Sequence, residues 1–204
     1  MSDWGEIITD WNDKVSFVGK HKSSSKIIDF TDKESLNEIM RYSVIEKLNI
    51  KLPIKNESEF IITTKPISLL DVINYIEQTK GKIEIIYLFL YTVNDKAANY
   101  ICELSKRSEL KVIISDLMNS KREKERMITR IFDNANTEIV FCHNHAKLAA
   151  IKINDNYYVL SGSMNAGNNA RIETLQISNN INLYDFIVKT YDKLKTEFQI
   201  NKRY

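Results

Sequence analysis

The sequence predicts an α/β fold, in which a mixed, mostly parallel β-sheet is flanked by helices and carries a β-hairpin bearing the polar motif residues. From about residue 65, segments with helical periodicity alternate with short apolar segments, a pattern typical of a sheet covered by helices. After residue 142 the pattern changes to two strands around a short polar turn, which is typical of a hairpin.

The segment of residues 1–60 is less regular and forms the first predicted unit, with one expected helix. Thr31 and Glu34 form a capping-box pair, and apolar residues follow at helical spacing as far as Leu48. No motif indicates a role for this unit. Residues 61–204 form the second unit, which we expect to hold the function.

The second unit is expected to alternate helices with strands. The predicted helices cover residues 69–80, 95–107, 121–133 and 183–198. The predicted strands before the hairpin cover residues 83–91, 110–117 and 137–142. Ser68 and Asp71 are expected to cap the first helix, which ends at Gly81, and Ser120 and Glu123 to cap the third.

The hairpin is expected to join residues 147–153 to residues 157–163 around the polar turn "NDN". One further short strand, over residues 174–178, precedes the last helix.

Composition excludes several classes of protein. The 204 residues suit one globular domain, and a net charge of +2 provides no global field for nucleic acid, so any polyanion contact must be local. The N-terminus lacks the basic start and apolar run of a secretory signal, and no apolar window is long enough to span a membrane. Cys102 and Cys142 are too few for a disulfide scaffold. We therefore expect a cytoplasmic protein without a membrane partner.

Two of the three histidines lie close together in the segment "FCHNHAK". If residues 143–147 are extended, the side chains of His143, His145 and Lys147 point the same way, because successive residues of a strand alternate faces. This spacing predicts a local patch that holds imidazole and ammonium groups.

A second polar group follows about 15 residues later. Gly162 allows a close backbone approach, Ser163 and Asn165 offer hydrogen bonds, and Glu173 supplies a carboxylate. With His145 and Lys147 these residues can hold and attack a phosphoryl group, and their charges make a metal or other cofactor unnecessary.

These residues carry a resemblance to a known family. "HAK" at residues 145–147, "GSMN" at 162–165 and Glu173 resemble the H-x-K, G-S-x-N and E signature of the phospholipase D superfamily. The match is closest to its short bacterial nucleases with a single motif and to metal-independent restriction endonucleases. It covers roughly residues 65–204.

The resemblance implies a catalytic role for each matching residue. His145 would form a covalent phosphohistidine, Lys147 would bind the phosphate, and Ser163 and Asn165 would assist Lys147. Glu173 would orient a histidine. A second histidine must act as general acid and then base, and a homodimer would supply it from its second chain. The implied activity is endonuclease cleavage of nucleic acid, DNA rather than RNA, without cofactors.

The sequence departs from the family pattern in two places. The family has an Asp five residues after the motif lysine, where this chain has Lys152, and Asp155 falls in the predicted turn. The gap between Lys147 and Gly162 is also about three residues longer than usual, which predicts an extended hairpin.

Other interpretations of these residues stay open. His143 and His145 also have the spacing of a metal pair, with Cys142 or Glu173 as a further ligand. The serine and asparagine of "GSMNAGNN" also suit a turn with Gly162 and Gly167. Tyr87, Phe89 and Tyr91 repeat every second residue and are expected to form one face of a core strand.

One helix carries a row of arginines at four-residue spacing: Arg122, Arg126 and Arg130. The row can follow a nucleic-acid backbone and is, with His143, a candidate for binding substrate. Glu123 and Glu125 alongside equally fit a solvated face. A non-catalytic module that binds nucleic acid or protein is the alternative function, and lipid hydrolysis is less favoured because no amphipathic membrane helix is expected.

Overall fold

The computed structural model describes residues 50–64, 67–117, 137–166 and 172–199, together with short strands at residues 8–10, 14–16 and 25–27. The predicted helices at residues 31–48 and 121–133, with Arg122, Arg126 and Arg130, lie outside the described residues. So does Gly167.

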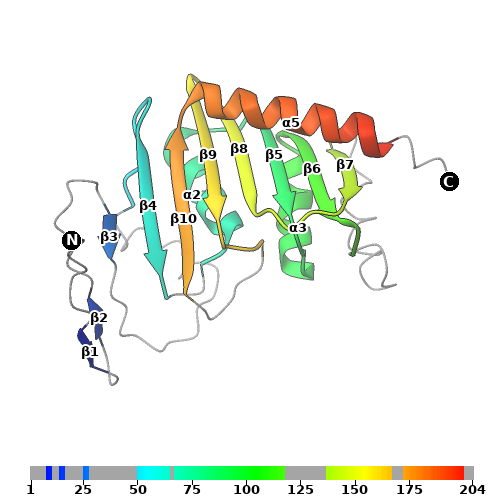
Figure 1. The fold of residues 1–204 in the computed structure, drawn as a ribbon. Helices are drawn as coiled ribbons and strands as arrows, with labels where there is room; N and C mark the ends of the chain where they lie inside the picture. The colour runs from blue at the N-terminus through cyan, green and yellow to red at the C-terminus, as the bar shows by residue number, and fades with distance from the viewer. Residues whose placement is uncertain are drawn as a thin grey trace, which may run out of the picture.

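Eight strands form one sheet in the order β3-β4-β10-β9-β8-β5-β6-β7 (Figure 1). Their bounds are Ser25–Ile27 (β3), Ser58–Thr63 (β4), Ile85–Leu90 (β5), Glu109–Ser115 (β6), Thr137–Cys142 (β7), Leu148–Ile153 (β8), Asn156–Gly162 (β9) and Glu173–Asn179 (β10). A separate antiparallel pair consists of β1 (Ile8–Asp10) and β2 (Lys14–Ser16). Because β3 and part of β4 precede residue 61, the first predicted unit contributes to the same sheet.

The α/β class and the motif-bearing hairpin are confirmed, but the prediction of a mostly parallel sheet is wrong. The pairs β4–β10, β10–β9, β9–β8 and β8–β5 are antiparallel, whereas β3–β4, β5–β6 and β6–β7 are parallel. A tight turn reverses the chain between β8 and β9, with Asn154 in the left-handed region at φ 50°, and such a turn always joins antiparallel neighbours. Among the described residues, the helix at residues 95–105 joins the parallel neighbours β5 and β6.

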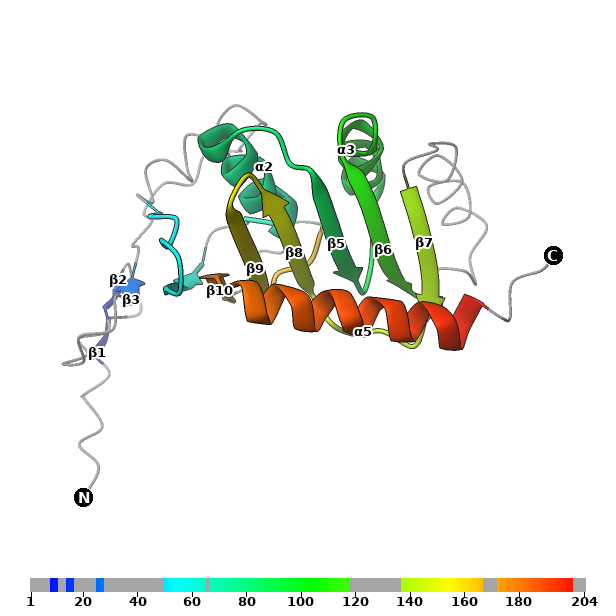
Figure 2. The same cartoon turned by 90° about the horizontal axis from the view of Figure 1, so that it is seen from above.

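The helices form separate layers on the two faces of the sheet. Figure 2 shows α2 (Leu69–Lys80) and α3 (Asp95–Ser105) on one face and α5 (Ile181–Gln199) across the other. The predicted capping box of α2 is present, because the Ser68 hydroxyl accepts from Asp71 N at 3.2 Å and the Asp71 carboxylate accepts from Ser68 N at 2.8 Å. None of the helices in the described part of the chain has the length and apolar character needed to cross a membrane.

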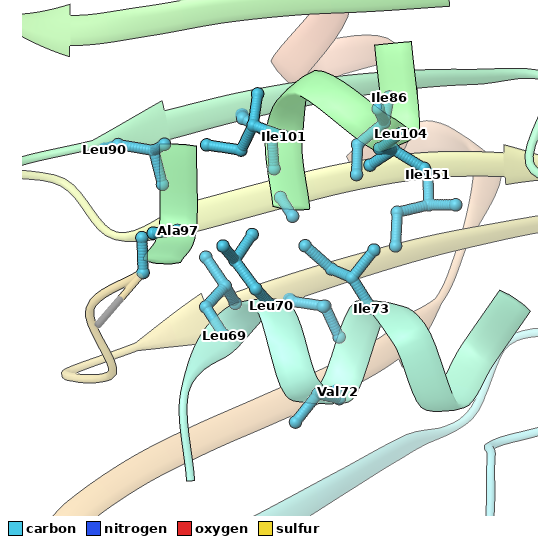
Figure 3. Close-up of a cluster of buried hydrophobic side chains, with 14 of the residues drawn as sticks. Leu69, Leu70, Val72, Ile73, Ile86, Leu90, Ala97, Ile101, Leu104 and Ile151 are labelled. Atoms are coloured by element: carbon cyan, nitrogen blue, oxygen red, sulfur yellow. The ribbon is translucent and has the colours of Figure 1, made fainter. Parts of the chain in front are cut away.

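Apolar side chains fill both spaces between the layers. The larger cluster lies between the sheet and α2 and α3 (Figure 3) and includes Leu70, Ile73, Ile86, Ile101, Leu104 and Ile151. On the other face, the row Tyr87 and Phe89 packs against α5, where the Tyr87 ring makes edge contacts with Tyr184 and Tyr191. Burial on both faces explains why β5 and β6 are almost continuously apolar.

The alternating strand directions bring the motif residues to one end of the sheet. The carboxyl end of β5 lies beside the amino end of β8, with Phe89 opposite Leu148, and Leu148 faces Ser161 near the end of β9. The start of β10 completes this row, with Leu175 opposite Gly162. We call this end the motif edge. Carboxyl ends of parallel strands commonly carry the functional site of an α/β protein.

Candidate active site

The two neighbouring histidines contact different parts of the motif edge. Residues 143–147 form a loop between β7 and β8 and not a strand, so the condition for all three side chains to share one direction is not met. His143 is exposed, with its Nδ1 3.4 Å from the carboxylate of Asp116 after β6. His145 instead contacts Tyr91, the residue after β5.

Asn144 anchors this loop to the sheet, a role that we did not predict. Its side-chain amide donates to Leu90 O at 3.1 Å, and its carbonyl oxygen accepts from Ala146 N at 3.0 Å. The second bond, from a backbone N–H two residues on, is typical of an asparagine-centred turn, which is a pattern that can be read from sequence. The loop therefore holds His145 and Lys147 at a fixed place beside β5.

Gly162 brings β9 close to β10. A Cβ on this residue would lie 2.0 Å from the carbonyl oxygen of Thr174, a separation that no real contact allows. The prediction that Gly162 permits a close backbone approach is correct for the neighbouring strand. Gly162 N also donates to Lys147 O at 3.4 Å, so the "GSMN" segment lies directly beside the end of "HAK".

Ser163 and Glu173 form a hydrogen-bonded pair across the β9–β10 junction. The Ser163 hydroxyl donates to the Glu173 carboxylate and accepts from Thr174 N at 2.9 Å. Glu173 is buried, so the Ser163 hydroxyl supplies a hydrogen bond that water would give to an exposed carboxyl group. Among the described residues, Glu173 is therefore hydrogen-bonded to Ser163. The implied role of Glu173 in orienting a histidine stays a prediction.

Asn165 lies between the motif edge and the start of α2. Its backbone carbonyl accepts from Leu69 N at 3.0 Å, and its side-chain oxygen is buried without a hydrogen-bond partner among the described residues. This oxygen is an acceptor, which can take a hydrogen bond from a donor such as an ammonium or hydroxyl group. This is consistent with a role in holding substrate, which stays a prediction.

Lys152, at the position of the family's Asp, lies far from the motif edge. It is five residues beyond Lys147 along β8, roughly 16 Å at the rise of a strand. Its ammonium pairs with the exposed carboxylate of Glu84 at 2.6 Å, and this hydrogen bond lowers the pKa of Glu84. Asp155 is exposed in the turn at the same end. Position 152 therefore lies at the opposite end of β8 from the motif edge.

We expect the Lys152→Ala variant to keep the cleavage rate of the wild type within about twofold, as surface substitutions remote from a site usually do. Cleavage of a labelled DNA oligonucleotide, which tests the endonuclease activity that the resemblance implies, is measured on both proteins at matched concentration. A loss of more than about tenfold would show that this position acts on the motif edge after all.

The metal interpretation requires several ligand side chains around one ion. No group of three or more His, Cys, Asp and Glu side chains within the described ranges is placed to hold an ion. Cys142 is buried in the sheet, and burial together with the Asp116 carboxylate raises the pKa of its thiol, which disfavours the thiolate that metals bind.

A cleft of about 620 Å³ lies at the opposite end of the sheet. Its basic residues are Lys82, Lys106, Arg107 and Lys111. Three of these are neutralised by ion pairs, Lys106 with Glu103, Arg107 with Glu77, and Lys111 with Glu109 and Glu138. None of the motif residues lines this cleft, so we place the candidate site at the motif edge.

The architecture and the motif edge together define a phospholipase D-like fold. A scan against protein-family models finds no match, and neither does a search of the curated proteins. Solved structures do match. Nuc from Salmonella typhimurium, described as a phospholipase D family member, is 17% identical with a TM-score of 0.52, and the match covers 70% of this chain and 95% of that one.

Two further solved structures share the fold. NucT from Helicobacter pylori is 18% identical with a TM-score of 0.50, over 68% of this chain and 96% of that one. Polyphosphate kinase from Porphyromonas gingivalis is 13% identical with a TM-score of 0.54, over 69% of this chain and 26% of that one. At these identities the likeness concerns the fold, and it confirms the fold that the sequence resemblance implies.

Proposed function

We propose that this protein is a metal-independent phosphodiesterase of the phospholipase D superfamily, an endonuclease that cleaves nucleic acid, DNA rather than RNA. The observation that carries this proposal is the convergence of "HAK", "GSMN" and Glu173 on one edge of the sheet through the registers of β8, β9 and β10. Three separate segments between residues 145 and 173 supply a nucleophile, a cation and a hydrogen-bonded carboxylate there.

The proposed reaction has two displacements. A ring nitrogen of His145 attacks phosphorus, the bond from phosphorus to the leaving oxygen breaks, and a second histidine protonates that oxygen. The same histidine then takes a proton from water, which attacks phosphorus as the P–N bond breaks. Lys147 lies beside His145, with its Nζ 3.1 Å from His145 O, and can stabilise charge on the phosphoryl oxygens.

The need for a second histidine is the reason to propose a homodimer. Within one chain the candidate for this role is His143, but it contacts Asp116, whereas His145 contacts Tyr91. The partner's His145, brought by a two-fold axis at the motif edge, would complete the site. Leu117 and Ile172, 51% and 70% exposed, flank this edge and offer apolar surface for such a contact.

The test of the activity is cleavage in excess EDTA. Supercoiled plasmid, single-stranded DNA, RNA and phosphatidylcholine vesicles are each incubated with the protein. Cleavage of DNA that persists in EDTA supports the proposal. Cleavage that requires added Mg²⁺ or Zn²⁺ would support the metal interpretation. Hydrolysis of lipid without cleavage of nucleic acid would show that the substrate is a lipid. Binding of DNA without any cleavage would support the non-catalytic module.

Subunit mixing tests the composite site. Wild type and the His145→Ala variant are unfolded together in equal amounts and refolded. If each site needs a histidine from both chains, the mixture should show about one quarter of the activity of the same total amount of wild type. Independent sites would give about one half.

A further inference from the structure

Tyr91 lies at the centre of the contacts around His145. It follows β5 directly and is half-buried, whereas Tyr87 and Phe89 of the same row are buried against α5. The ring centroids of Tyr91 and His145 are 4.3 Å apart, with the planes tilted by 56°. The Nζ of Lys147 lies 5.1 Å from the centroid of the same tyrosine ring. One aromatic ring thus packs beside both functional side chains of the "HAK" motif.

We propose that Tyr91 is a positioning residue, which holds the imidazole of His145 and the ammonium of Lys147 in the arrangement that attack on phosphorus requires. The proposal rests on the proposed function. Glu173, which the resemblance implies as the group that orients a histidine, is hydrogen-bonded to Ser163. His145 is exposed, and its imidazole packs against the Tyr91 ring, a contact that limits the directions the imidazole can take.

The contacts identify the aromatic ring as the active part of Tyr91. The ammonium of Lys147 lies over the Tyr91 ring and donates to the His145 carbonyl oxygen at 3.1 Å. Since the ring face accepts no conventional hydrogen bond, the ammonium still has N–H groups that can donate to a phosphate. Phenylalanine presents a similar ring without the hydroxyl. We therefore expect Tyr91→Phe to preserve the function and Tyr91→Leu to lose it.

The kinetic test compares wild type, Tyr91→Phe and Tyr91→Leu in single-turnover and steady-state cleavage in EDTA. Tyr91→Leu should lower kcat by roughly 100-fold with a much smaller rise in KM, because the reacting groups are misplaced while the substrate still binds. Tyr91→Phe should stay within about threefold of wild type. Tyr157→Leu is the matched control, a half-buried tyrosine that packs on Tyr184 at the turn end of the hairpin.

A second readout does not depend on activity. The ring current of Tyr91 should displace the imidazole proton resonances of His145, which a His145→Ala spectrum assigns. The displacement should remain in Tyr91→Phe and disappear in Tyr91→Leu. The resonances can be compared even if the wild type cleaves no substrate. An inactive wild type would overturn the proposed function but not the contact between Tyr91 and His145. Unchanged resonances in Tyr91→Leu, wild-type kcat in Tyr91→Leu, or an equal loss in Tyr91→Phe would each overturn the positioning role.

Discussion

The His145→Ala variant should lose cleavage by roughly 1,000-fold or more, measured as single-turnover cleavage of a labelled DNA duplex in EDTA. The loss is expected because the variant has no nitrogen to form the phosphorus bond, and removing a nucleophile costs more than removing a group that only binds. His145 is exposed in a loop that Asn144 anchors, so the fold should be unaffected.

His143→Ala is the matched comparison, since His143 is exposed in the same loop and is joined to Asp116 at 3.4 Å. We expect its loss to stay below about tenfold, as for a residue that contributes only to binding. Circular dichroism and thermal unfolding of both variants establish that the fold is intact. An equal loss in the two variants would contradict the assignment of His145 as the nucleophile.

Gly162→Ala should destabilise the protein by about 3 kcal/mol, because the added Cβ meets the Thr174 carbonyl at 2.0 Å and β10 must move away from β9. Cleavage should fall as well, since this movement separates Ser163 from Glu173. Urea unfolding followed by circular dichroism measures the free energy, and the oligonucleotide assay measures the rate.

Gly81→Ala provides the control for adding a methyl group to a glycine. Gly81 has φ 106°, but a Cβ there has space, with Asn154 Nδ2 at 3.8 Å. This variant should lose about 1 kcal/mol from backbone strain and leave the cleavage rate unchanged, because Gly81 lies at the opposite end of the sheet from the motif. A smaller loss of stability for Gly162→Ala than for Gly81→Ala would contradict the described contact between β9 and β10.

Local patterns predicted the elements well because their physical causes are local. The capping box of Ser68 and Asp71 lies within four residues of sequence and needs no tertiary contact. The hairpin over residues 147–163 was likewise visible from its alternation and its turn. The direction of β8 relative to β5 was not visible, because their pairing joins residues about 60 apart in the chain.

The sequence predicts which residues form the candidate site, and that assignment stays a prediction; it does not predict their contacts. The motif spacing proposes His145, Lys147 and Glu173, but whether Glu173 accepts a hydrogen bond from Ser163 or from a histidine depends on the register of β9 and β10. Tyr91 continues a buried aromatic row, and period-2 alternation alone cannot show that the row leaves the core at the end of β5.

The same limit applies to Lys152. A sequence comparison counts its difference from the family's Asp as a change in the motif. The structure instead places Lys152 in an ion pair with Glu84 at the far end of β8. The strand register, which the sequence does not reveal, therefore decides whether a changed motif position lies near the motif edge.

The covalent intermediate provides the most direct test. A labelled DNA substrate is mixed with wild type and quenched in alkali within milliseconds, since phosphohistidine survives base and is lost in acid, and the adduct is mapped by peptide mass spectrometry. We predict a nucleotidyl adduct on His145 that is absent from His145→Ala and that forms and decays at rates matching turnover. An adduct on another residue, or rapid turnover without any adduct, would contradict the phosphohistidine mechanism.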